Sequence, residues 1–461
     1  MQQWEQAIDT FIAQNEQNIL RDIGRLVAVP SVQGQPAPGA PFGPGPKAAL
    51  EKALEIAAEL GLAVRNCEDR IGWAELPGAE PGKYIATITH LDVVPTGNGW
   101  DADPFVMRQR EGWILGRGVA DDKGPSVLCL YALRFLKEQG LPLRYGVRAL
   151  LGTNEETGMA DVDYYLENYP APAFCFSPDA EFPVCNGEKG HYGANLVSPV
   201  CAGDILDFTG GFAPNAVPDE ASALVRADLA ALPPAPGITL AAEGEAVRVS
   251  GHGKAGHASM PEGTVNAIGL VVDYLLANGI GNEAERACLA VLQKLHAASD
   301  GSALGAAADD GRFSPLTIIG GTIKMEGGRI VQSVDSRYPT NTNADILTRQ
   351  LAAAAAGAMT VEDVHTNVPF YIEPDAAPIR TLIDTYNEVT GENAKPFTMG
   401  GGTYARHFPL AVSFGPERQG QALPGFAGPM HGANEGAEIR AMLEALKIYI
   451  LALGRLEALE L

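Results

Sequence analysis

Apolar positions near the start of the chain follow two alternating patterns. Short, mostly apolar runs such as residues 83–90 predict buried β-strands. Longer stretches with apolar residues three or four positions apart, such as 47–60 and 124–140, predict helices, and the second helix is expected to be buried. The Gly/Pro-rich stretch 34–46 is expected to form a loop, because these residues disfavour helices and central strands. Strands that alternate with helices predict an α/β domain with a mixed, mostly parallel sheet and helices on both faces.

The pattern changes near residue 187. From there the sequence contains short strands joined by hairpin-like turns, with helices expected near 264–278 and 343–358. After residue 378 the first pattern returns and ends in a long helix. We therefore predict a discontinuous first domain, residues 1–186 and 378–461, which is interrupted by an inserted α+β domain of residues 187–377.

Length and composition exclude several classes of protein. At 461 residues the chain is too long for one ordinary core, which agrees with two domains. It carries 33 basic against 56 acidic residues, and a net charge of −23 would repel phosphate backbones, so no nucleic-acid partner is expected. We find no run of about 18 apolar residues and no signal-peptide pattern, so we expect a cytoplasmic protein without a membrane span. The six cysteines are scattered without a C-x-x-C pair, which predicts reduced thiols.

Side chains that can bind metals follow the predicted strands of the first domain or lie in tight, glycine-flanked turns. Ligands of such sheets bind beyond the carboxyl ends of the strands, so we expect these side chains to meet. Imidazoles and carboxylates together form a shell that zinc and similar divalent ions accept. The candidates are His90, Asp92, Asp121, Asp122, Glu155, Glu156, Asp179 and His431.

Two pairs among these candidates allow a division of roles. His90 and Asp92 are two positions apart on one strand, so both side chains should point the same way, with His90 on the metal and Asp92 fixing its other ring nitrogen. In the pair Glu155–Glu156, one carboxylate can bind metal while the other acts as a general base. Each short pattern alone is more often a turn or a helix cap than a ligand set. Their occurrence together, in order, favours a metal site.

Seven longer motifs give the sequence a resemblance to a known family. They are HLDVVPTGNGW, GRGVADDKGP, TNEETG, SPDAEFPVCNGEKG, GHASMPEGTVNAI, GGGTYAR and MHGANE, and they cover nearly the whole chain in order. Together they resemble the dinuclear metallopeptidases that include peptidase V, carnosinase, glutamate carboxypeptidase, aminoacylase and succinyl-diaminopimelate desuccinylase. They are most similar to the branch of bacterial peptidase V-type dipeptidases. The resemblance implies two divalent metal ions per chain, zinc first, with manganese or cobalt as alternatives.

The resemblance also implies a role for each candidate in the first domain. It implies that Asp121 bridges the two metals and that the Asp121–Asp122 peptide bond is cis. It implies that Glu155 is the general base and that Asp92 orients His90. The remaining ligands fall into two pairs, His90 with Asp179 at one metal and Glu156 with His431 at the other.

Further residues are expected to bind substrate. The resemblance implies that His257 polarises the scissile carbonyl with help from Asn215, and that Arg337 grips the C-terminal carboxylate, which a guanidinium can hold bidentately. Three consecutive glycines expose backbone N–H groups that could cradle the same carboxylate. They are Gly400, Gly401 and Gly402. Members of this branch carry an enlarged lid in place of a dimer partner, so we expect a monomer whose inserted domain is this lid.

The predicted function is hydrolysis of unblocked dipeptides by a water that a dinuclear metal site activates, with a small peptide as the only expected partner. An N-acyl-amino-acid amidase or desuccinylase remains an alternative, because it would use the same metals and differ in whether a free amine is recognised. An inactive scaffold is disfavoured, since Glu155 and every ligand are present. A dinucleotide-binding dehydrogenase is disfavoured because no G-x-G-x-x-G follows the first strand.

Overall fold

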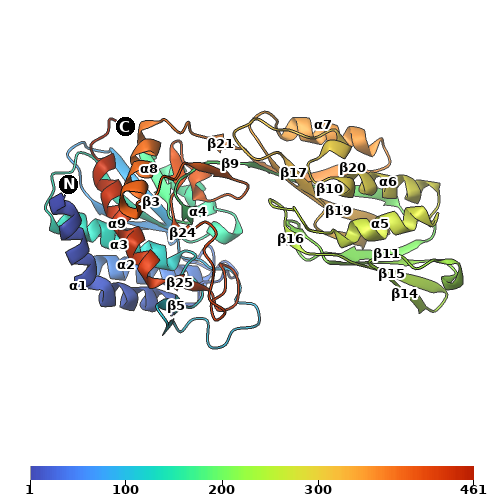
Figure 1. The fold of residues 1–461 in the computed structure, drawn as a ribbon, viewed down its shortest axis with the longest axis horizontal. Helices are drawn as coiled ribbons and strands as arrows, with labels where there is room; N and C mark the ends of the chain where they lie inside the picture. Colours follow the sequence, from blue (N-terminus) through green and yellow to red (C-terminus); the bar gives the residue numbers. More distant parts are fainter. Residues whose placement is uncertain (1) are drawn as a thin grey trace. The chain divides into compact units, whose positions relative to one another are not determined.

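The computed structural model describes residues 2–461, and these divide into two compact units. The first unit consists of residues 2–186, Ile372–Phe397 and Gly402–Leu461. The inserted unit consists of Gly187–Tyr371 together with Thr398–Gly401. Figure 1 shows both as ribbons, coloured along the sequence. Within residues 2–461, no helix has both the length and the apolar character that a membrane crossing needs.

The first unit is built on a mixed sheet whose central strands are parallel. The strand order is β1-β2-β6-β3-β7-β23, and the four strands from β6 to β23 run parallel to one another, which confirms the predicted α/β fold. The bounds are β1 Ala63–Cys67, β2 Ile71–Leu76, β3 Tyr84–His90, β6 Gly146–Gly152, β7 Phe174–Ser177 and β23 Ala411–Ser413. Shorter strands of this unit are β4 Arg108–Arg110, β5 Trp113–Leu115, β8 Ala180–Phe182, β24 Pro416–Arg418 and β25 Gly436–Glu438. Strands β9 Cys185–Glu188 and β22 Phe397–Met399 include residues of both units, and β21 Phe370–Tyr371 belongs to the inserted unit.

Helices cover both faces of this sheet, as two neighbouring residues of β2 demonstrate. Successive residues of a strand point to opposite faces. A Cβ on Gly72 would lie 2.9 Å from Leu50 of α2, whereas the Trp73 ring packs edge-on against Tyr165 of α4 at 5.8 Å. The helices are α1 Gln2–Val27, α2 Pro44–Glu59, α3 Lys123–Glu138, α4 Ala160–Asn168, α8 Ala377–Thr390 and α9 Ile439–Leu456, with the 3₁₀ turns η1 Glu155–Thr157 and η4 Tyr404–His407.

The register of the parallel strands aligns their carboxyl ends. His90, the last residue of β3, lies opposite Gly152, the last residue of β6. On the other side of β3, Thr87 lies opposite Phe176, and the hydroxyl of Ser177 at the end of β7 donates to the carbonyl of Ile88 at 3.0 Å. The residues that follow these three strands therefore emerge at one edge of the sheet.

The inserted unit is an antiparallel sheet covered by helices. Its strand order is β14-β15-β13-β11-β18-β19-β10-β20, with β17 beside β19. The bounds are β10 Gly190–Val200, β11 Ile205–Gly210, β13 Glu220–Val225, β14 Ile238–Glu243, β15 Ala246–His252, β17 Thr317–Ile319, β18 Ile323–Glu326, β19 Arg329–Tyr338 and β20 Thr360–Asn367. A separate pair joins β12 Ala216–Val217 and β16 Gly256–His257, and the 3₁₀ turns are η2 Leu229–Ala231 and η3 Ser302–Leu304. The helices are α5 Ala267–Ala277, α6 Glu283–Ala297 and α7 Ala344–Ala355.

Two local predictions were wrong. The loop expected over 34–46 ends earlier, because α2 begins at Pro44. Proline is tolerated in the first turn of a helix, where its missing N–H would have no partner in any case. Helix α6 of the inserted unit was not predicted, although its sequence carries a start signal. Asn282 and Glu285 form a capping box there, with each side chain accepting the other residue's backbone N–H.

Candidate metal centre

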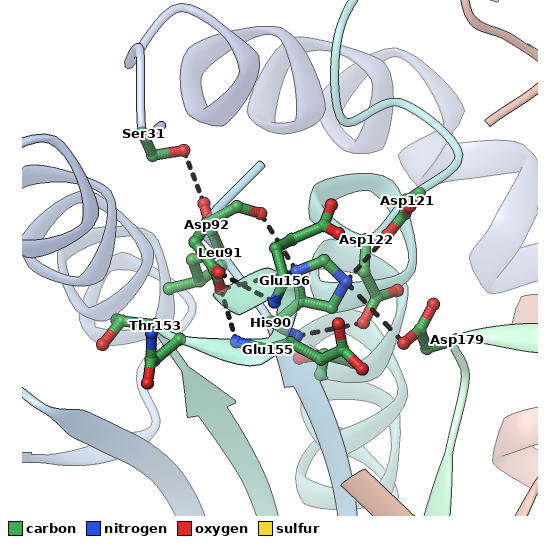
Figure 2. A network of polar contacts seen from close by, with 12 residues as sticks. Ser31, His90, Leu91, Asp92, Asp121, Asp122, Thr153, Glu155, Glu156 and Asp179 are labelled. Carbon is green, nitrogen blue, oxygen red and sulfur yellow. Dashed lines mark hydrogen bonds and ion pairs between the residues drawn. The ribbon is translucent and has the colours of Figure 1, made fainter. Parts of the chain in front are cut away.

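Five segments of the first unit bring imidazoles and carboxylates together. His90 ends β3, Glu155 and Glu156 form the turn η1 after β6, and Asp179 follows β7 (Figure 2). Asp121 does not end a strand but lies in the turn that leads into α3, and His431 lies in the loop before β25. We call His90, Asp121, Glu155, Glu156, Asp179 and His431 the candidate metal centre.

The carboxylate of Asp121 lies between the two imidazoles of this centre. Its Oδ1 is 2.7 Å from Nε2 of His90, and its Oδ2 is 2.8 Å from Nε2 of His431. The His90 side chain is 1% exposed, whereas that of His431 is 56% exposed. Each oxygen of this one carboxylate thus faces a different ring nitrogen.

The remaining carboxylates surround this arrangement on both sides. Oε2 of Glu156 lies 3.2 Å from Nε2 of His431, and Oδ2 of Asp179 lies 3.7 Å from Nε2 of His90. Ligand atoms lie within 4.8 Å of one another in two sets, one of His90, Asp121 and Glu156 and one of His90, Glu155 and Asp179. Both adjacent glutamates therefore reach the centre.

Buried polar atoms without partners show that the centre fits a cation. Among the described residues, Oε1 of Glu156 is buried without a hydrogen-bond partner, and the buried Nε2 of His90 and Oδ1 of Asp121 face each other at 2.7 Å but form no hydrogen bond of acceptable geometry. A native fold rarely leaves such atoms unsatisfied unless an ion or water completes them. Nitrogen and oxygen donors in this mixture suit zinc, and they also suit manganese and cobalt.

In the absence of a cation the pKa values of Glu155, Asp179 and His431 are raised. The pKa of Asp121 is lowered, because its burial is outweighed by the charge of His90 together with the hydrogen bond to His431. Burial, followed by the charge of Asp179, raises the pKa of Glu155 well above its usual value. Burial, followed by the charge of Asp121, raises that of Asp179. The hydrogen bond to Asp121 is the main reason that the pKa of His431 rises to about 10. Clustered carboxylates in a buried place resist ionisation unless positive charge is supplied.

Asp92 contacts His90 in a way that differs from the prediction. Nδ1 of His90 lies 3.0 Å from the backbone carbonyl of Asp92 but 3.6 Å from the nearer carboxylate oxygen, so the carbonyl accepts the hydrogen bond. This fixes the proton on Nδ1 and leaves the lone pair of Nε2 for a metal. The Asp92 carboxylate instead accepts the backbone N–H groups of Glu155 and Glu156, each at 3.1 Å.

A second buried carboxylate, which the sequence analysis missed, supports the same turn. Oδ2 of Asp161 accepts the backbone N–H groups of Thr153 at 2.6 Å and Asn154 at 3.1 Å. The hydroxyl of Tyr404 donates to the same oxygen at 2.5 Å. Tyr404 belongs to the GGGTYAR motif, which was the only sequence signal for this contact. Asp92 and Asp161 together hold four consecutive backbone N–H groups.

The Asp121–Asp122 peptide bond is cis, as the resemblance implied. Asp122 is fully buried, and its Oδ2 accepts the backbone N–H of His90 at 3.0 Å. Asp122 therefore holds the end of β3 against the start of α3 and is not part of either ligand set.

Two of the predicted substrate residues lie side by side in the inserted unit. Asn215 directly precedes β12, whose Ala216 pairs with His257 of β16, and the carbonyl of Asn215 accepts the N–H of Ala258 at 2.9 Å. The backbone N–H of Ser259 donates to Nδ1 of His257 at 3.2 Å. Since Nδ1 accepts that bond, the neutral ring carries its proton on Nε2, the atom that a carbonyl oxygen could meet.

Arg337 of β19 is held in place by its own unit. Its Nε and Nη2 donate to the two oxygens of Asp335, at 2.9 and 3.3 Å, and Nη1 donates to the carbonyl of Gly400 at 3.3 Å. A Cβ on Gly400 would lie 2.8 Å from that of Ser259, so the backbone there passes close to the His257 loop. Gly401 belongs to the same unit, whereas Gly402 belongs to the first unit. That the N–H groups of these glycines bind a carboxylate stays a prediction.

The fold and this centre define a candidate metalloenzyme of the α/β class. The chain belongs to Peptidase family M20/M25/M40, whose sequence model matches residues 86–455. The protein is therefore a peptidase, which is a hydrolase.

Individual relatives match along almost the whole chain. The Beta-Ala-Xaa dipeptidase of Lactobacillus delbrueckii subsp. lactis is 31% identical over 456 residues, which cover 95% of this chain and 96% of that protein. YtjP of Bacillus subtilis (strain 168) is 28% identical over 467 residues, which cover 96% and 98%. Among solved structures, the aminoacylhistidine dipeptidase of Vibrio alginolyticus matches with a TM-score of 0.60 at 14% identity, over 95% of this chain and 96% of that one. The last match supports the fold.

Proposed function

We propose that this protein is a metal-dependent dipeptidase that hydrolyses unblocked dipeptides at a dinuclear centre. The observation that carries the proposal is the position of Asp121, whose two oxygens lie 2.7 and 2.8 Å from two different imidazoles. Membership of the peptidase family supports the reaction class, and the name of the Lactobacillus relative supports a dipeptide as substrate.

The proposed ligand assignment is the one that the resemblance implies, and the short distances between Glu156 and His431 and between Asp179 and His90 support it. Asp121 is the shared ligand. The other ligands are His90 and Asp179 for one ion and Glu156 and His431 for the other. Zinc is the first choice, with manganese and cobalt as alternatives, because all three accept nitrogen and oxygen donors. When bound, such ions lower the pKa of a water towards neutrality and polarise the substrate carbonyl.

Glu155 is the proposed general base. It takes a proton from the attacking water and later gives that proton to the leaving amine. Its backbone N–H is tied to Asp92, so the carboxylate extends from a fixed turn. Nε2–H of His257 and the side-chain amide of Asn215 are the proposed donors to the carbonyl oxygen, each typically contributing about 3–4 kcal/mol to the transition state.

Recognition of the C-terminal carboxylate is assigned to Arg337. Asp335 occupies the edge of the guanidinium formed by Nε and Nη2, and Nη1 donates to the carbonyl of Gly400, so the remaining N–H groups of Nη1 and Nη2 are the proposed donors to the substrate carboxylate. Because Asp335 holds the Arg337 guanidinium in one orientation, less conformational entropy is lost when the substrate carboxylate binds. The backbone around Gly400 is the proposed second contact.

The test begins with protein stripped by a chelator. Zinc, manganese or cobalt is added back separately, and each sample is assayed against dipeptides, a tripeptide and N-acyl amino acids. The proposal expects metal-restored cleavage of dipeptides. Cleavage of N-acyl amino acids instead would keep the centre and move the function to deacylation, and the absence of metal-dependent hydrolysis would refute an active peptidase centre.

A matched pair of histidine variants controls this test. His431→Gln should abolish metal-restored activity. His407→Gln removes an imidazole that pairs with Asp163 at 3.0 Å on the same unit, outside the centre, and should leave the activity unchanged. Equal losses in both variants would contradict the assignment of His431.

Compartment and assembly belong to the same proposal. None of the six cysteines forms a disulfide bond, which agrees with a reducing cytoplasm. A monomer with the inserted unit as lid is the proposed assembly, and light scattering of the purified protein tests it directly.

A further inference from the structure

Arg117 and Glu435 form an ion pair that is buried inside the first unit. Nη1 of Arg117 donates to Oε2 of Glu435 at 2.7 Å, and the side chains are 1% and 0% exposed. A buried pair is weak evidence for stability, because desolvating both charges costs about as much as their attraction returns. Neither residue belongs to the ligand sets, so the pair needs another explanation.

The second oxygen of Glu435 holds the turn that leads to Asp121. Its Oε1 accepts three backbone N–H groups, from Gly118 at 3.0 Å, Ala120 at 3.0 Å and Asp121 at 3.2 Å. Three donors on one oxygen fix the path of the backbone between them. The position of the Asp121 carboxylate therefore depends on Glu435.

Arg117 holds the loop that carries His431. Its Nη2 donates to the carbonyl of His431 at 3.2 Å and lies 3.3 and 3.4 Å from the carbonyls of Pro95 and Thr96. His431 has a φ of 63°, in the left-handed region that residues other than glycine adopt at a cost. Such a conformation persists only where neighbouring groups stabilise it.

We propose that Arg117 and Glu435 are positioning residues for the metal position between Asp121 and His431. The pair links the two loops and so sets the 2.8 Å approach of the His431 ring to the Asp121 carboxylate. His90 is held independently, by the backbone of Asp92 and by Asp122. Loss of the pair should therefore weaken the ion on the His431 side far more than the ion on the His90 side. This inference rests on the proposed dinuclear centre.

Two conservative variants test the pair. Glu435→Gln keeps the shape, but its amide N–H₂ would face the Arg117 guanidinium, donor against donor. Arg117→Lys keeps the charge, but one ammonium cannot reproduce the planar fork that reaches both Glu435 and the His431 carbonyl. Each metal-stripped protein is titrated with Co²⁺, and binding is followed by calorimetry and by the visible absorption of bound cobalt.

The wild-type protein should bind two Co²⁺ ions. In both variants the ion on the His431 side should bind about 10- to 100-fold more weakly, the usual effect of removing a residue that orients a ligand. The ion on the His90 side should lose much less affinity, because it shares only Asp121 with the disturbed loops. The absorption bands should change mainly with the second equivalent. Glu75→Gln is the matched control, since it breaks the Arg148–Glu75 pair of 2.7 Å in strands β2 and β6, and it should bind both ions like the wild type.

Three outcomes would overturn the inference. Wild-type affinities and spectra in both variants would make the pair purely structural. Equal weakening of both ions, together with a lower urea midpoint for the metal-free protein, would indicate general loosening of the unit. No binding by the wild-type protein would refute the proposed centre itself. If Glu435→Gln does not fold, Arg117→Lys decides alone.

Discussion

The carboxylate of Asp92 accepts the backbone N–H of Glu155 at 3.1 Å. The other oxygen of the same carboxylate accepts the N–H of Glu156, and the carbonyl of Asp92 meets the ring of His90. One buried residue thus orients three side chains of the candidate metal centre. In each of these three contacts one of the two partners is a backbone group.

Asp92→Asn should impair the centre without unfolding the protein. Asparagine has one acceptor oxygen, so its amide N–H₂ would face one of the two backbone N–H groups of the turn. An unsatisfied buried donor costs about 1–3 kcal/mol. We expect turnover to fall about 10- to 100-fold and metal to bind more weakly, as measured by steady-state kinetics and calorimetry. Unchanged values of both would mean that the turn does not depend on Asp92.

Glu155 and Glu156 should respond differently to the same substitution. Glu155→Gln removes a proton acceptor, so turnover should fall about 10²- to 10⁴-fold while both metal equivalents remain after dialysis. Glu156→Gln removes a ligand beside His431, so one equivalent should be lost. Metal content by atomic absorption, measured beside initial rates, separates the two effects. Loss of metal from Glu155→Gln would instead make Glu155 a ligand, in the set that it shares with His90 and Asp179.

Arg337→Lys should weaken binding of substrates that have a free C-terminal carboxylate. Lysine offers a single ammonium and cannot keep both Asp335 and a bidentate contact to substrate. We expect the KM for a dipeptide to rise about 10- to 100-fold, which corresponds to one charged hydrogen bond. The C-terminal amide of the same dipeptide serves as the control, because it lacks the charge. A similar loss for the amide would show that Arg337 acts on something other than the carboxylate.

The end of β3 shows how much of the centre the sequence predicts. Apolar runs predict the strands, and parallel order places their carboxyl ends together, so His90, Glu155 and Asp179 could be expected to meet. The contact of Asp92 could not be predicted in the same way. The chain leaves the strand at His90, so strand alternation no longer governs where the Asp92 side chain points.

The Arg117–Glu435 pair shows what sequence patterns miss. The two residues are 318 positions apart, and each lies in a glycine-rich loop that has no hydrophobic period. Their partners are mostly backbone groups, which any sequence provides. The resemblance already implied that the loops of Asp121 and His431 meet, but only the folded chain reveals the ion pair that joins them. Helix α6 is the opposite case, since its capping residues Asn282 and Glu285 were visible in the sequence.

The stabilisation that metal gives should grow with pH. Glu155, Asp179 and His431 all have raised pKa values in the metal-free protein, so they hold protons that a metal must displace. Affinity therefore rises as pH rises towards the pKa of about 10 for His431. A tighter complex stabilises the native state more at a fixed metal concentration. The Tm increment on adding zinc to chelator-treated protein should thus be larger at about pH 8 than at about pH 6.

Two lysines also titrate in this pH window. Burial lowers the pKa of Lys123 to about 7 and that of Lys189 to about 8, but both titrate with and without metal, so comparing loaded with stripped protein removes most of their effect. His431→Gln should flatten the pH dependence. An increment that stays constant or shrinks as pH rises would show that metal binding releases no protons from these groups.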